Sequence, residues 1–181
     1  MDSARYKKAI ERNLAELQWA IIHRTTMQGI EQAKPVYHYF HHSVYNSLFN
    51  DYISHCIKVF ERSEQAASFW YIYKTNAKRI DDYCASTGID LNEIEAFVPK
   101  LKHIRDKTHF HIDVEGVLDP EQIWSDADIN GKALGAAIDS VWKILVHLQE
   151  LLALPKVELP HYTIESAKKA ALRVESTQAS T

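Results

Sequence analysis

Apolar residues recur every three or four positions along most of this chain, with charged and polar residues between them. Over residues 4–28 this spacing predicts a long amphipathic helix that ends near Gly29. Residues 35–60 repeat the pattern after Pro35, a residue suited to the first turn of a helix. The apolar positions that carry these two stripes are Ile10, Leu14, Leu17 and Ile21, then Val36, Phe40, Val44, Leu48 and Tyr52.

Three further helical segments follow. The third is predicted between an N-cap at Ser63 and a stop at Gly88, and a fourth begins at Asp90. Because a proline inside a helix removes a hydrogen bond and clashes with the preceding turn, we expect a kink or restart near Pro99. The last long helix starts near residue 128 and is stopped by Pro155.

Residues 155–181 form a polar tail with one weakly amphipathic stretch, at residues 164–174, and a Ser/Thr/Gln end that we expect to be partly disordered. The predicted fold is therefore all-α: a single-domain antiparallel helical bundle of about five helices over residues 1–154, followed by the tail.

Composition narrows the class of protein. With five glycines and five prolines in 181 residues, the chain suits long helices, and its formal charge of −3 gives no global basic field for indiscriminate nucleic-acid binding. Cys56 and Cys84 lack paired spacing, which is typical of buried free thiols. No stretch approaches the ~18 apolar residues of a membrane span. These features predict a cytoplasmic protein without a membrane anchor.

Residues 102–113 hold the highest density of basic, histidine and aspartate side chains in the chain. The spacing of the apolar residues also changes within this segment. The helical stripe continues to about Lys107, and beyond it apolar residues alternate with polar ones: Thr108, Phe110, Ile112 and Val114 against His109, His111 and Asp113. Alternation with β-branched residues favours an extended backbone, so we expect the helix to end within this segment.

Arg105 and a nearby histidine supply two functions that RNA cleavage without a metal requires. A guanidinium binds phosphate through paired hydrogen bonds, and an imidazole exchanges protons near neutral pH. In an unbroken helix His109 would share the face of Arg105, whereas a break after Lys107 lets His111 turn towards it. The alternative is a solvated helix end without a binding function, where such cations interact favourably with the helix dipole.

Three other interpretations stay open. His109, His111 and Asp113 share one side of an extended segment and could bind a metal, although such runs usually end a strand of a sheet. The aromatic cluster at residues 69–73 could stack bases, but its helical spacing is more typical of core or dimer packing. Scattered cations, among them Lys102 and Lys107, could form a local basic groove or a solvated face.

The residues from Ile104 to Asp113 resemble the signature of the HEPN superfamily, and most closely its abortive-infection and toxin branch. That motif is an arginine, a polar residue and, after four to six intervening residues, a histidine. Arg105, Asp106 and His111 match it, and Asp113 also fits that branch. His109 follows Arg105 too closely to be the motif histidine. The resemblance in helix order and motif position covers roughly residues 4–154.

This resemblance implies a helical homodimer whose two motifs meet in a cleft, metal-independent RNA cleavage, and often a nucleotidyltransferase antitoxin as partner. The leading hypothesis is thus an endoribonuclease of a toxin–antitoxin or abortive-infection system that needs no cofactor. Arg105 would bind the scissile phosphate, His111 would act as acid or base, and Asp106 and Asp113 would orient them, with His109 and Lys107 in support. The alternative is a catalytically silent HEPN-like module that binds RNA, a nucleotide or a protein.

Overall fold

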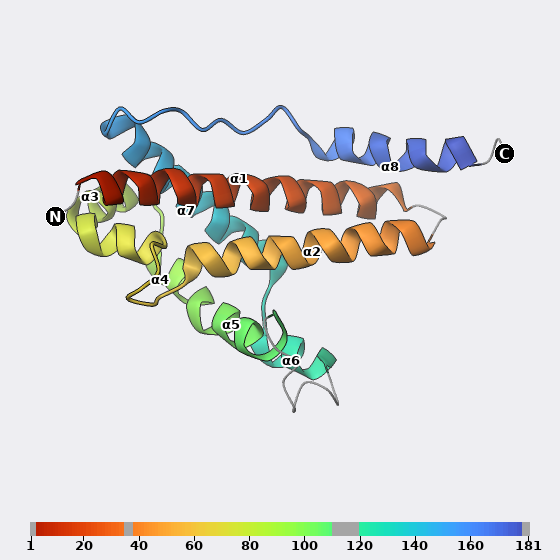
Figure 1. Ribbon diagram of the computed structural model, residues 1–181, viewed down its shortest axis with the longest axis horizontal. Coiled ribbons are helices and arrows are strands. Elements are labelled where there is room, and N and C mark those ends of the chain that lie inside the picture. Colours follow the sequence, from red (N-terminus) through yellow and green to blue (C-terminus); the bar gives the residue numbers. More distant parts are fainter. Residues whose placement is uncertain (1–2, 35–37, 110–119, 179–181) are drawn as a thin grey trace. The chain divides into compact units, whose positions relative to one another are not determined.

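The computed structural model describes residues 3–34, 38–109 and 120–178, and across these residues the regular structure is entirely helical (Figure 1). The all-α prediction is confirmed. Eight α-helices and one π-helical turn lie in the described part of the chain, where the sequence predicted about five helices. The difference arises because the structure divides the region after Gly88 into shorter helices and adds a helix near the C-terminus.

The helices follow one another with these bounds: α1 Ser3–Ala33, α2 His38–Phe60, α3 Phe69–Thr87, α4 Leu91–Glu95, α5 Phe97–Ile104, the π-helical turn η1 Arg105–His109, α6 Pro120–Ala127, α7 Gly131–Leu151 and α8 Ile164–Gln178.

The chain divides into two compact units. One unit consists of Met1–Leu17 and Ser54–Val157, and the other of Gln18–Ile53 and Glu158–Thr181. Helices α1 and α2 contribute residues to both. All the residues of the predicted site that the structure describes belong to the first unit.

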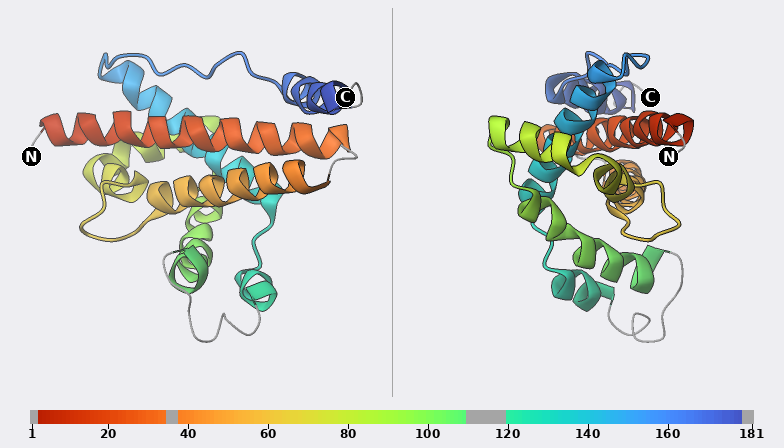
Figure 2. Two further views of the ribbon diagram at one scale, coloured as in Figure 1. Left: turned by 45° about the vertical axis from the view of Figure 1, so that its right-hand side comes forward. Right: turned by 90° about the vertical axis from the view of Figure 1, so that its left-hand side faces the viewer.

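The first unit is built around α7. Its apolar stripe is buried along the whole helix, and both α3 and α4 pack against it. Helix α5 lies beside α6 and continues into η1 (Figure 2). The fully buried side chains of Leu101 and Ile104 anchor α5 in the core. This anchoring fixes the backbone immediately before Arg105.

Helix boundaries in the first unit follow local sequence signals in part. Gly88 ends α3 with a left-handed φ of 71°, a conformation that glycine adopts without strain, so this prediction is confirmed. The Asp90 side chain caps α4 by accepting from the Asn92 N–H at 2.8 Å. The N-cap of α3 is Ser68 and not Ser63, because the Ser63 carbonyl closes a turn with the Ala66 N–H.

The predicted restart near Pro99 is also seen. Helix α4 ends at Glu95 and α5 begins at Phe97, so Pro99 is the third residue of α5. In the first turn of a helix an amide N–H has no intrahelical acceptor, and the proline therefore removes no hydrogen bond there.

In the second unit, the predicted stop at Gly29 is wrong, because α1 continues to Ala33. A Cβ at Gly29 would collide with the Ala167 side chain of α8 and lie 2.8 Å from the Lys168 nitrogen. This glycine therefore permits a close helix crossing and does not end the helix. Figure 1 shows α8 running beside this part of α1.

Beyond Pro155 the chain forms α8, which contains the weakly amphipathic stretch at residues 164–174. Ala167 and Ala171 of this helix are buried, and the Ala171 carbonyl lies 3.3 Å from Nε2 of His41. The weakly amphipathic stretch thus forms a packed helix. Among the helices described, none combines the length and apolar character that crossing a membrane demands.

Candidate functional site

Arg105 is the first residue of η1, directly after the last residue of α5. Regular α-helix ends at Ile104, and a π-helical turn continues through His109. The predicted extended backbone is therefore wrong for Thr108 and His109. Thr108 is β-branched, yet it is held in the turn because its Oγ1 donates to the Ile104 carbonyl at 2.8 Å. Such π-helical turns are rare and occur frequently at functional sites.

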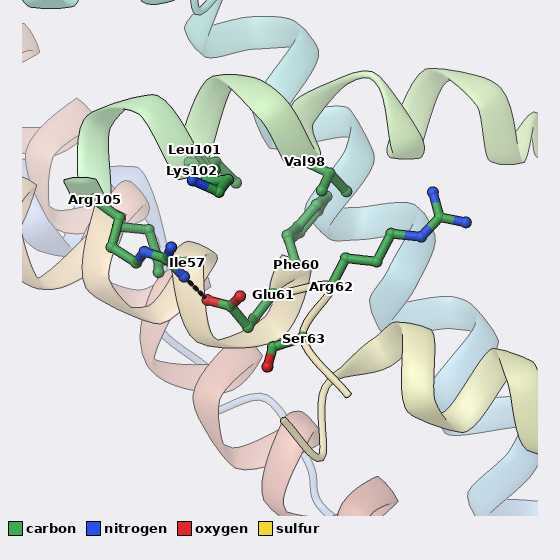
Figure 3. A pocket seen from close by; sticks show the side chains of 9 residues that line it. All are labelled: Ile57, Phe60, Glu61, Arg62, Ser63, Val98, Leu101, Lys102 and Arg105. Carbon is green, nitrogen blue, oxygen red and sulfur yellow. Dashed lines mark hydrogen bonds and ion pairs between the residues drawn. The ribbon is translucent and has the colours of Figure 1, made fainter. Parts of the chain in front are cut away.

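The guanidinium of Arg105 is held by two carboxylates. Its Nη1 pairs with Oε2 of Glu61, the residue that follows α2 (Figure 3). Its Nε and Nη2 lie 2.8 and 2.7 Å from Oδ1 of Asp106. Arginine has five N–H groups, so its contacts with the described residues leave two N–H groups for another acceptor.

Lys102 extends this arrangement by one more ion pair. It lies one turn before Asp106 on the helix and binds its carboxylate. The hydrogen bond from Lys102, together with that from Arg105, lowers the pKa of Asp106 below its ordinary value. The hydrogen bonds to Glu61 and Asp106 raise the pKa of Arg105. Along these contacts acidic and basic side chains alternate, in the order Glu61, Arg105, Asp106 and Lys102.

A cavity of about 330 Å³ opens beside Arg105. Its walls come from the C-terminal end of α2, the residues that follow α2, and α5 (Figure 3). The lining residues are Ile57, Phe60, Glu61, Arg62, Ser63, Val98, Leu101, Lys102 and Arg105. The side chains of Arg105 and Glu61 are 25% and 23% exposed, so a ligand in the cavity can reach both.

The structure brings together only part of the predicted set. Arg105 and Asp106 are in direct contact, and Lys107 lies half-buried in the same π-helical turn. His111 and Asp113 lie outside the described residues, as does the side chain of His109. The preference for His111 over His109 therefore stays a prediction. Its backbone argument is weakened, because the chain remains helical through His109.

Glu61 is the residue of this candidate site that sequence reasoning missed. It lies 44 positions before Arg105, and no local pattern links the two. The only signal is its place at the end of the apolar stripe of α2, where a charged residue is unremarkable.

Comparisons with models of known protein families, with curated proteins and with solved structures gave no match. The described side chains include no cluster of three or more histidines, cysteines, aspartates and glutamates that could hold a metal ion. The predicted metal alternative, His109 with His111 and Asp113, rests on side chains outside that set.

Proposed function

We propose that this protein is a metal-independent endoribonuclease of the HEPN type, acting in a toxin–antitoxin or abortive-infection system. The observation that carries the proposal is the state of Arg105. Its guanidinium lines a cavity, is oriented by two carboxylates and, in its contacts with the described residues, leaves two of its five N–H groups for a further acceptor. A phosphate diester needs such a fixed, partly exposed pair of donors.

The chemistry assigned to the site is a transesterification. A base removes the proton of a ribose 2′-hydroxyl, the 2′-oxygen bonds to phosphorus, and the bond from phosphorus to the 5′-oxygen breaks. An acid protonates the departing 5′-oxygen, so the products carry a 2′,3′-cyclic phosphate and a 5′-hydroxyl. Arg105 would stabilise the charge on the transition state, and His111 would serve as acid or base. Asp106 orients Arg105, and Asp113 would orient His111.

The resemblance to the HEPN superfamily supplies the rest of the proposal. In that family two copies of the motif meet in a homodimer, and a nucleotidyltransferase antitoxin is a frequent partner. A homodimer would bring a second Arg105 and a second His111 to one cleft. The proposed substrate is RNA, and the proposed place of action is the cytoplasm.

The test is incubation of the purified protein with RNA in the presence of a chelator. We expect cleavage products that end in 2′,3′-cyclic phosphate, and their rate should fall by at least about 100-fold in His111→Ala and Arg105→Ala. Arg79→Ala is the matched control, because Arg79 is an exposed arginine of α3 that does not line the cavity. This variant should cleave RNA at the rate of the wild type. Equal cleavage by the wild type and His111→Ala would remove the role given to His111.

One observation favours the second candidate, a catalytically silent module that binds RNA, a nucleotide or a protein. Arg62, Lys102 and Arg105 each pair with a carboxylate in this structure, so the site carries no surplus positive charge. Expression in a bacterial host separates the two functions. An active toxin slows growth unless Arg105 or His111 is changed, whereas a silent module leaves growth unaffected by either change.

A further inference from the structure

The walls of the cavity beside Arg105 fall into an apolar part and a polar part. Ile57, Phe60 and Leu101 are buried residues whose side chains line one part, and the half-buried Val98 completes it. Such a surface, with only a few polar groups at its margin, is typical of small-molecule sites, and a volume of about 330 Å³ lies within their usual range.

The polar part offers groups that match a nucleotide. Arg105 can donate to a phosphate, the exposed Ser63 hydroxyl can donate or accept, and the Glu61 carboxylate can accept from an N–H group of a base. A nucleobase has apolar faces and polar edges, and its phosphate lies on one side. The cavity presents the complementary arrangement, with an apolar wall, polar groups at the margin and a cation at one end.

A second cavity, of about 400 Å³, adjoins the first and shares Arg62 and Val98 with it. Arg62 is held between the two, because its guanidinium pairs with Glu95 and lies 5.1 Å from the centre of the Trp70 ring. A free nucleotide would need only one of these hollows. Two adjoining hollows with a fixed cation between them suit consecutive nucleotides of a chain.

We propose that the cavity formed by the end of α2 and by α5 is a nucleotide subsite for single-stranded RNA, with a base on the apolar wall and its phosphate at Arg105. The proposal rests on the ribonuclease function proposed above, and it adds that the protein binds bases as well as phosphates. A base can reach this wall only when it is unstacked, so the substrate is an unpaired segment.

The test measures binding separately from cleavage. Fluorescently labelled oligonucleotides with 2′-O-methyl riboses lack the attacking hydroxyl and cannot be cut. One oligonucleotide carries uracil bases, and the other is an abasic chain of the same length and charge. Since stacking of one base contributes ~1–3 kcal/mol, the wild-type protein should bind the abasic chain at least about fivefold more weakly in an anisotropy titration.

Val98→Trp should fill the junction of the two cavities without removing a charge. We expect it to bind the uracil chain as weakly as the abasic chain and to leave abasic binding unchanged. Ile89→Trp is the matched control, because Ile89 is also half-buried in the same unit but lines neither cavity. It should retain the preference of the wild type.

The outcomes separate this proposal from the function on which it rests. Equal wild-type affinity for the two chains overturns the subsite, whatever Val98→Trp does, even if unmodified RNA is cleaved. If both tryptophan variants lose the preference for the uracil chain over the abasic chain, the location of the subsite at this cavity is also overturned. Base-dependent binding that only Val98→Trp removes, without any RNA cleavage, supports the subsite and refutes the ribonuclease.

Discussion

At the residue scale, the pair formed by Arg105 and Glu61 decides how readily the site can take a phosphate. Both side chains are about a quarter exposed, and solvent-accessible ion pairs of this kind typically contribute no more than about 1 kcal/mol. A phosphate that binds the guanidinium through two charge-assisted hydrogen bonds makes a stronger contact. Glu61 therefore orients Arg105 in this structure, and on the proposed function it would give way to an RNA phosphate.

The first prediction concerns Glu61→Gln, which removes the competing charge and keeps the shape of the side chain. RNA affinity should rise by up to about fivefold, as expected from an ion pair of ~1 kcal/mol. Anisotropy titrations with the uncleavable uracil chain measure this change. Glu64→Gln is the control, since Glu64 is exposed and lies three residues further on, outside the cavity. An equal gain in both variants would point to general charge and contradict the role of Glu61.

Half of this residue network follows from the spacing of the residues in the sequence. Arg105 and Asp106 are neighbours in the chain, and Lys102 precedes Asp106 by one helical turn, so these contacts follow from helix geometry. The pairing of Arg105 with Glu61 depends on how the end of α2 packs near α5. Such a long-range contact leaves no periodicity in the sequence.

At the scale of elements, a buried carboxylate joins α1 to α2 within the first unit. Glu16 of α1 lies 2.6 Å from Nδ1 of His55 and 3.1 Å from Nζ of Lys58, both on α2, and 3.2 Å from Nε of Arg12. Burial by itself raises the pKa of Glu16, but the hydrogen bonds from His55 and Lys58 outweigh it and lower the pKa below its ordinary value of 4.5.

A second prediction follows for stability against pH. Since the folded pKa of Glu16 is depressed, its contribution is complete above pH 4.5 and is lost as the pH falls through the folded pKa. The wild type should exceed Glu16→Gln by ~1–3 kcal/mol in free energy of unfolding at neutral pH, and the two should converge in acid. Urea denaturation at several pH values measures both. Glu11→Gln, at a more exposed carboxylate of α1, should show only a small difference. A gap between wild type and Glu16→Gln that persists unchanged in acid would contradict the assignment.

The contact between α1 and α8 in the second unit gives a third prediction. Alanine in a helix interior is usually favoured over glycine by about 1 kcal/mol, but a Cβ at Gly29 meets Ala167 and the backbone of α8. Gly29→Ala should therefore destabilise the protein by ~1–3 kcal/mol through overpacking. Hydrogen exchange should accelerate in α8. Gly131→Ala, where a Cβ meets nothing within 4 Å, is the control and should be neutral or stabilising.

The helices show which sequence signals predict secondary structure correctly. The periodicity of α7 predicted its buried stripe, because a long amphipathic helix that packs on a core can bury only its apolar face. Gly88 ends a helix as predicted, whereas Gly29 does not, because a glycine needed for close packing looks the same in sequence. Alternation at Thr108 suggested extended backbone, but one hydroxyl bond to Ile104 keeps that residue helical.

At the scale of the whole molecule, the net charge bears on the RNA binding proposed above. The chain carries a formal charge of −3, and the three cations around the cavity each face a carboxylate. Proteins that bind nucleic acid by their electrostatic field neutralise many phosphates and release many counterions. For the RNA binding proposed above we therefore expect few phosphate contacts at this cavity, so that recognition would depend on Arg105 and on base contacts.

The last prediction is a shallow salt dependence of RNA binding. For single strands the logarithm of affinity falls with the logarithm of salt by about 0.7 per phosphate contacted, so one or two contacts reduce affinity only ~3- to 7-fold between 50 and 200 mM salt. A protein with six to ten contacts would lose roughly 10³- to 10⁵-fold on duplex DNA. Glu61→Gln should steepen the slope by no more than about 0.7, since it frees one cation. Anisotropy titrations of the uncleavable chain across this salt range give the slope directly, and a loss above about 100-fold would mean that a basic surface away from the cavity binds the RNA.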